Sequence, residues 1–105
     1  MSHNYEAQRR ETFQTFAEAA SSVRLPKTAV VEFVFFVEEL DADWDAFEAA
    51  LRGAGFKTVR EDEETVIASI GPIAVTPEAI WVQERIATQI ALKFEFYPDG
   101  WDLAE

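Results

Sequence analysis

Carboxylates are the side chains through which this sequence could do chemistry. The chain of 105 residues has 20 Asp and Glu residues, no cysteine and a single histidine, His3. Without cysteine there is no thiol nucleophile, thiolate zinc site or iron–sulfur cluster. One histidine cannot form a metal centre or a catalytic triad without further ligands or an oriented nucleophile. Paired carboxylates are therefore the one catalytic arrangement that the sequence can supply.

One group of carboxylates has a metal-ligand spacing. Asp41, Asp43 and Asp45 match the opening of a calcium-binding EF-hand loop. The sixth position of that loop requires glycine and is Ala46 here, and the twelfth requires glutamate and is Arg52. We interpret the aspartates as a helix cap and first-turn acids that complement the helix dipole. The sequence thus predicts no metal site, and it has no glycine-rich motif for a phosphate-bearing cofactor.

A second possibility is a carboxylate pair such as Glu32 and Glu95, which we expect on one face of neighbouring strands. With 20 acidic residues in the chain, some carboxylates must lie close together by chance. A glycosidase or lyase needs one carboxyl in an apolar pocket with a raised pKa, which a small open sheet seldom encloses. We therefore expect a non-catalytic protein, and a small carboxylate-dependent enzyme is the alternative.

The acidic residues are concentrated in the later part of the chain. Residues 1–28 contain four basic and three acidic side chains, whereas residues 29–105 contain 17 acidic and five basic ones. Such a field repels phosphate backbones and anionic lipids, so we expect no direct binding of nucleic acid or membrane. It favours a basic protein partner, unless the acidic surplus serves only solubility or adaptation to salt. The lack of cysteine and of a signal peptide indicates the cytoplasm.

The elements that position these carboxylates start with a helix over residues 5–20 and a linker over residues 21–28. From Ala29 to Glu38, β-branched and aromatic residues predict a strand. One face of this strand is a continuous apolar row of Val31, Phe33, Phe35 and Val37. The other face alternates Val30, Glu32, Val34, Phe36 and Glu38. A strand with one face interrupted by carboxylates indicates a sheet that is covered on one side only.

The rest of the chain continues this alternation of strands and helices. Asp41 or Asp43 can cap a second helix, and two strands over residues 56–61 and 65–71 flank an acidic turn of Glu61, Asp62, Glu63 and Glu64. Thr76 and Pro77 begin a third helix, with an apolar stripe of Ala79, Val82, Ile86 and Ile90. Residues 92–97 alternate as a last strand, and residues 98–100 then turn the chain.

The order β-α-β-β-α-β predicts an α+β ferredoxin-like sandwich, with a four-stranded antiparallel sheet and two helices on one face. We expect residues 1–28 to form an N-terminal helix and linker and residues 29–105 the ferredoxin-like domain, in one compact unit. The same order builds the RNA recognition motif, but residues 65–71 contain neither an aromatic residue nor a cation. An RNA-recognition-like binding module is therefore a second alternative. The oligomeric state is left open.

A short motif near the C-terminus suggests a family. The run Tyr97, Pro98, Asp99, Gly100 and Trp101 resembles the Tyr-Asp-Gly-Trp ending of the regulator of ribonuclease activity B family, with Pro98 inserted. Residues 8–12 and 76–78 are similar to family members as well. The resemblance implies a ferredoxin-like, cytoplasmic, bacterial protein without catalytic activity, which inhibits endoribonuclease E by binding its arginine-rich scaffold region. Without the long acidic tail of the best-known members, the chain could instead bind another basic protein.

We expect the partner to bind the open sheet face together with the acidic turn. The residues predicted to contact it are Glu32, Glu38, Glu95, Glu61, Asp62, Glu63 and Glu64. The resemblance adds a family signature of Tyr97, Asp99, Gly100 and Trp101, which we do not assign to partner contact. For Asp99 and Gly100 a turn is the stronger interpretation.

Overall fold

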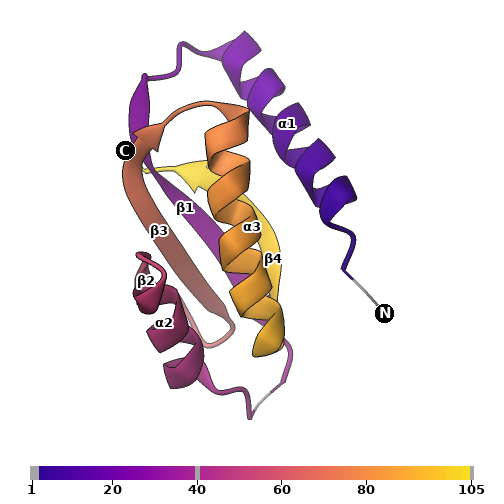
Figure 1. Ribbon diagram of the computed structural model, residues 1–105, viewed down its shortest axis with the longest axis vertical. Helices are drawn as coiled ribbons and strands as arrows, with labels where there is room; N and C mark the ends of the chain where they lie inside the picture. Colours follow the sequence, from indigo (N-terminus) through magenta and orange to yellow (C-terminus); the bar gives the residue numbers. More distant parts are fainter. Residues whose placement is uncertain (1–2, 40, 105) are drawn as a thin grey trace.

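The computed structural model describes residues 3–39 and 41–104, which form three helices and four strands (Figure 1). In chain order these are α1 (Tyr5–Ser22), β1 (Thr28–Val37), α2 (Trp44–Gly53), β2 (Lys57–Arg60), β3 (Thr65–Ala74), α3 (Pro77–Lys93) and β4 (Phe96–Leu103). The predicted order, a helix followed by β-α-β-β-α-β, is confirmed. The first helix runs two residues further than predicted, so the connection to β1 is shorter.

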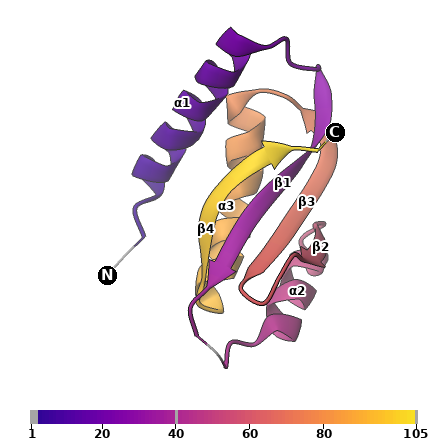
Figure 2. The same ribbon diagram turned by 180° about the vertical axis from the view of Figure 1, so that it is seen from behind.

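The four strands form one sheet in the order β2-β3-β1-β4, and every neighbouring pair is antiparallel. Helices α2 and α3 cover one face of this sheet, as the ferredoxin-like prediction requires (Figure 1). Seen from behind, the other face of the sheet has no helix in front of it (Figure 2). Helix α1 lies alongside α3, beyond the β4 edge. The sheet therefore presents one open face.

The core lies between the sheet and the two covering helices. The predicted apolar row of β1 is buried throughout, and it packs with core residues of both helices and of β3 and β4: Phe47, Leu51, Val66, Ala68, Ile80, Ala87, Ala91 and Phe96. Aromatic rings meet edge to face or stacked, with ring centroids 5.9 Å apart for Phe35 and Phe47 and 4.2 Å apart for Phe47 and Phe96. The alternation of β1 therefore does place one row inside and the other row outside.

Side-chain caps fix where the helices begin. The Asp43 carboxylate accepts a hydrogen bond from the Ala46 N–H at 3.0 Å, so it is the cap of α2. Thr76 Oγ1 accepts from the Ala79 N–H at 3.1 Å, and Pro77 follows it at the first helical position. Both predicted helix starts are confirmed.

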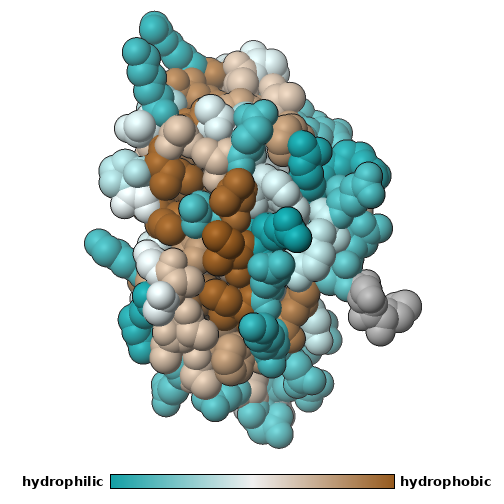
Figure 3. All heavy atoms as spheres, in the orientation of Figure 1, coloured by the Kyte–Doolittle hydropathy of each residue, from teal (hydrophilic) through white to brown (hydrophobic). Residues whose placement is uncertain are grey.

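The prediction that the apolar stripe of α3 forms its buried face is wrong. The buried residues of α3 are Ile80, Glu84, Ala87, Thr88 and Ala91. Val82 is 52% exposed and Ile86 37% exposed, and hydrophobic side chains are visible along the outer surface of α3 in Figure 3. The reason is that α3 has two neighbours. One side packs on the sheet through apolar and small residues, and another side meets α1 through polar residues.

The last strand also differs from the prediction. Helix α3 continues to Lys93, Glu95 makes the connection with a φ of 64°, and β4 spans the residues expected to form a turn. Phe33 pairs with Trp101 and Phe35 with Pro98, so β4 has one residue more than β1 over this stretch. That residue is accommodated by a β-bulge, where Gly100 has a φ of 101° that favours glycine. Residues 98–100 therefore form an irregular part of a strand.

Candidate protein-binding site

The strand register determines which side chains lie on the open face. Glu32, Val34 and Phe36 point away from the core, because they alternate with the buried row of β1. Their partners in register lie on the same face and come from β3 and β4: Ser69, Ile67, Thr65, Tyr97 and Asp102. The open face thus combines apolar and aromatic side chains with the carboxylates of Glu32 and Asp102.

Two aromatic rings lie together at one end of this face. The ring centroids of Phe36 and Tyr97 are 5.7 Å apart, and Tyr97 is 38% exposed. Tyrosine with an exposed ring is enriched in protein interfaces, because it offers apolar area together with a polar hydroxyl. This pair could therefore contact a partner directly.

A cleft of about 420 Å³ opens next to Phe36, at the end of β1. We call it the sheet-end cleft, and it is lined by Phe36, Val37, Glu38, Glu39, Trp44, Glu63 and Glu64. The backbone N–H of Val37 donates to the Glu64 carbonyl at 2.9 Å, which holds the turn between β2 and β3 against the end of β1. Two acidic segments, one after β1 and one between β2 and β3, thereby line the same cleft.

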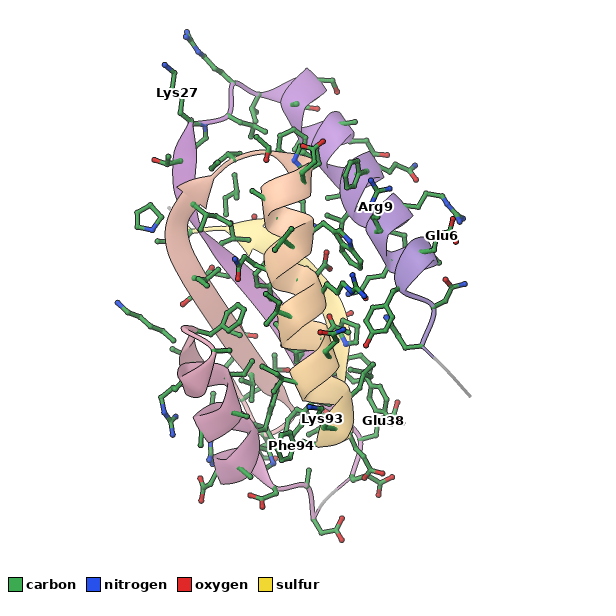
Figure 4. All side chains as sticks on the ribbon, in the orientation of Figure 1. Glu6, Arg9, Lys27, Glu38, Lys93 and Phe94 are labelled. Atoms are coloured by element: carbon green, nitrogen blue, oxygen red, sulfur yellow. The ribbon has the colours of Figure 1, made fainter. Side chains whose placement is uncertain are left out.

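Arg60 shows how this end of the molecule holds a cation. Its guanidinium lies 2.6 Å from carboxylate oxygens of both Asp45 and Glu48 and 5.2 Å from the ring centre of Trp44. The hydrogen bond to Glu48 raises the pKa of Arg60 above its ordinary value. These are the only ion pairs among residues 3–39 and 41–104, so within those ranges the four glutamates of the cleft have no cationic partner. Lys93 lies at the same end as Glu38 (Figure 4).

The structure places six of the seven predicted partner-contacting residues in three positions. Glu38, Glu63 and Glu64 line the sheet-end cleft, and Glu61 and Asp62 are exposed in the adjoining turn. Glu32 lies on the open face, in register with Asp102 of β4 rather than with Glu95.

The expectation that Glu95 is on the sheet face is wrong. It lies in the connection between α3 and β4, because α3 continues to Lys93 instead of ending before Leu92. Since Phe96 pairs with Val37, this connection is at the same end of the sheet as Glu38. Glu95 is exposed there.

The signature residues of β4 face different surroundings. Tyr97 is on the open face, Asp99 and Gly100 are exposed in the bulge, and Trp101 is partly buried against the core. Trp101 was expected beyond the last strand, but it lies within β4 opposite Phe33.

Sequence reasoning missed Glu39 and the two aromatic walls of the cleft, Phe36 and Trp44. The pair of glutamates that follows β1 could have indicated Glu39. The sequence contains no comparable signal for the approach of the β2–β3 turn to β1, because that approach depends on tertiary packing.

Within residues 3–39 and 41–104, no three histidine, aspartate or glutamate side chains gather in a way that could hold a metal ion. No helix in those ranges has the length and apolar character needed to cross a membrane.

A comparison with models of protein families gives a match that covers nearly the whole chain. The model of a family described as regulator of ribonuclease activity B matches residues 6–103, which extend from α1 to the end of β4. No curated protein matches the chain.

Proposed function

Because the chain belongs to the regulator of ribonuclease activity B family, we propose that it controls a ribonuclease by binding a basic region of that enzyme. The family is regulatory rather than catalytic, which is consistent with a protein partner. We take the ribonuclease to be endoribonuclease E and the bound region to be its arginine-rich scaffold. The cytoplasm is the compartment for this activity, in keeping with a chain that has no cysteine.

The observation that carries the proposal is the sheet-end cleft, where carboxylates without an ion-pair partner among the described residues lie beside the partly buried rings of Phe36 and Trp44. Arginine suits such a site better than lysine, because a planar guanidinium can bind a carboxylate with two hydrogen bonds and stack on an aromatic face. The contact of Arg60 with Asp45, Glu48 and Trp44 is an example of this geometry at the same end of the molecule.

The open face next to the cleft extends this binding surface. A partner segment with an arginine in the cleft would meet the Phe36 and Tyr97 rings, whose burial would add apolar contact area. Glu32 and Asp102, further along the same face, would attract additional basic residues. Long-range attraction of this kind acts mainly on the association rate, and it weakens as salt screens the charges.

The proposal can be tested by calorimetric titration of the whole chain with the arginine-rich scaffold segment of endoribonuclease E from the same genome. Titrations at about 50 and about 300 mM salt should show saturable binding that is weaker at the higher salt. The variant Glu38→Gln/Glu64→Gln removes two cleft carboxylates. Each lost pair between a partly exposed carboxylate and an arginine of the partner should cost up to about 1 kcal/mol of binding free energy. The double variant should therefore lose up to roughly thirtyfold in affinity.

The matched control is Glu18→Gln/Glu78→Gln, which removes two exposed carboxylates from α1 and α3 and changes the net charge equally. It should bind almost as well as the unmodified chain. Equal losses in both variants would show that net charge, rather than the cleft, governs binding. No binding at either salt would reject this partner.

A further inference from the structure

A second cleft lies between α1, α3 and β4, at the β4 edge of the sheet. It has a volume of about 410 Å³, and we call it the helix cleft. Its walls include Gln8, Glu11 and Thr12 of α1, Glu84 of α3 and Trp101 of β4. Figure 4 shows side chains from α1 and α3 meeting between the two helices. The volume is in the range of sites that bind small molecules or side chains and is much larger than a metal ion requires.

The base of the helix cleft is a buried polar network. Gln8 Nε2 donates to Glu84 Oε2 at 3.2 Å and to Thr88 Oγ1 at 3.0 Å, and the Thr12 hydroxyl donates to the other oxygen of Glu84. These four residues are the buried polar side chains of the described chain, and Glu84 is only 4% exposed. The interface between α1 and α3 is thus built around a carboxylate.

Glu84 has no cationic partner within residues 3–39 and 41–104. Desolvation raises the pKa of Glu84 above its ordinary value, and the charge of Glu11 raises it further, whereas the Thr12 and Gln8 hydrogen bonds and His3 oppose the rise. A buried carboxylate without a counter-charge is costly unless it is protonated or meets a cation. An ionised carboxylate can accept about four hydrogen bonds, and Glu84 accepts two, so acceptor positions are left for a ligand.

The other walls of the helix cleft narrow the choice of cation. Glu11 supplies a second carboxylate from α1, and Trp101 supplies an aromatic ring from β4. A flat, delocalised cation can be hydrogen-bonded by carboxylates at its edge while its face lies against an indole ring, which a compact ammonium group does less well.

We propose that the helix cleft binds the guanidinium group of an arginine presented by the protein partner, between the Glu84 and Glu11 carboxylates and beside the Trp101 ring. The inference rests on the proposed function for the source of this arginine. The chemistry of the cleft is independent of that source. A free arginine and an arginine within a peptide would offer the same group.

The test uses N-acetyl-arginine methylamide as the probe, with the indole N–H signals of the full chain followed by NMR. Trp101→Phe identifies the signal of Trp101 among the three tryptophans. The arginine probe should shift this signal saturably. The isosteric but neutral N-acetyl-citrulline methylamide should not, and N-acetyl-lysine methylamide should bind more weakly. Equal shifts from the citrulline probe, or shifts of the other two indoles instead, would overturn the proposal.

Glu84→Gln keeps the size of the side chain and the acceptor for Thr12 but removes the charge. It should weaken binding of the arginine probe by about tenfold or more. Glu78→Gln, an exposed change of equal charge, should leave binding unaltered. Thermal unfolding of each variant verifies that it is folded. If Glu84→Gln does not fold, Glu11→Gln at an exposed position should produce the loss in its place. Unchanged binding in the folded variants would overturn the proposal.

Titration with the arginine-rich scaffold segment distinguishes failure of this inference from failure of the proposed function. If Glu84→Gln weakens binding of both the arginine probe and the segment, the arginine comes from the partner, as proposed. If only the probe is affected, the partner assignment is overturned and free arginine is the ligand. If the probe binds in the helix cleft but the segment binds nowhere, the proposed function fails while the guanidinium site stands.

Discussion

Replacing Thr12 with valine should destabilise the protein although it removes only one hydroxyl group. Thr12 is 3% exposed, and its hydroxyl donates to an oxygen of the buried Glu84. Valine has nearly the same shape, so the packing between α1 and α3 is kept. One carboxylate oxygen then lacks its donor in a place where water has little access.

The expected cost is the desolvation penalty of a buried acceptor that has lost its donor, about 1–3 kcal/mol of the free energy of unfolding. For a domain of this size, each kcal/mol lowers the melting temperature by about 4–8 °C. Thr15→Val is the matched control, because Thr15 is exposed on the same helix. Its effect should stay within about 0.5 kcal/mol.

Urea unfolding of the whole chain, followed by tryptophan fluorescence, measures both variants. The double variant Thr12→Val/Glu84→Leu adds a sharper criterion. With the carboxylate also removed, the absent hydroxyl leaves no acceptor unpaired there, so the double variant should lose less than the two single losses together. Gln8 also donates to Thr88 in the unmodified chain, so its side-chain amide should keep a partner in the double variant. Equal stabilities of Thr12→Val and Thr15→Val, or strictly additive losses, would refute the assignment of Glu84 as a buried, ionisable acceptor.

Two further predictions concern stability. Gly71→Ala should cost about 2 kcal/mol or more in urea unfolding, because Gly71 has a φ of 128° and an added Cβ would lie 2.8 Å from the Ala29 carbonyl oxygen. Gly53→Ala, which meets nothing within 4 Å, should instead stabilise α2 by up to about 1 kcal/mol. As pH rises from 4.5 through the raised pKa of Glu84, the folded state still holds a proton that the unfolded state has released, so stability should fall. Glu84→Gln should remove that part of the pH dependence, whereas the variant keeps Glu11 and His3, the titratable neighbours of Glu84. An identical pH profile in the variant would contradict the raised pKa.

The parts of the fold that could be predicted are those set by local pattern. Val31, Phe33, Phe35 and Val37 are buried as their alternation indicates, because a strand places successive side chains on opposite faces. The starts of α2 and α3 follow from capping residues, whose hydrogen bonds are formed within one helical turn. The open face and its carboxylate Glu32 follow from the same alternation.

The parts that could not be predicted depend on which neighbours an element meets. The sequence of α3 offers two stripes, and only the presence of α1 decides that Glu84 and Thr88 are buried while Val82 is exposed. Residues 92–97 alternate like a strand, yet the first of them continue α3. The bulge in β4 could not be predicted from β4 alone, because a bulge exists only relative to the strand that it pairs with, here β1.

The candidate site could be predicted in part for the same reason. Its acidic residues follow from composition, but the sheet-end cleft depends on the hydrogen bond that joins Val37 to Glu64. The helix cleft depends on α1 lying beside α3, and its central residue, Glu84, was not singled out because one glutamate on a helix carries no signal by itself.

The position of β1 at the centre of the sheet has a consequence for synthesis of the protein. Both of its neighbours, β3 and β4, come later in the chain, and Val31 pairs with Leu103 at the far end. Contacts between residues so distant in sequence slow folding, because a long loop must close before they form. During translation β1 is made early and then exposes both edges until β3 is completed, and β4 forms last. β1 therefore lacks both of its neighbours until the chain has been synthesised beyond Thr65, where β3 begins.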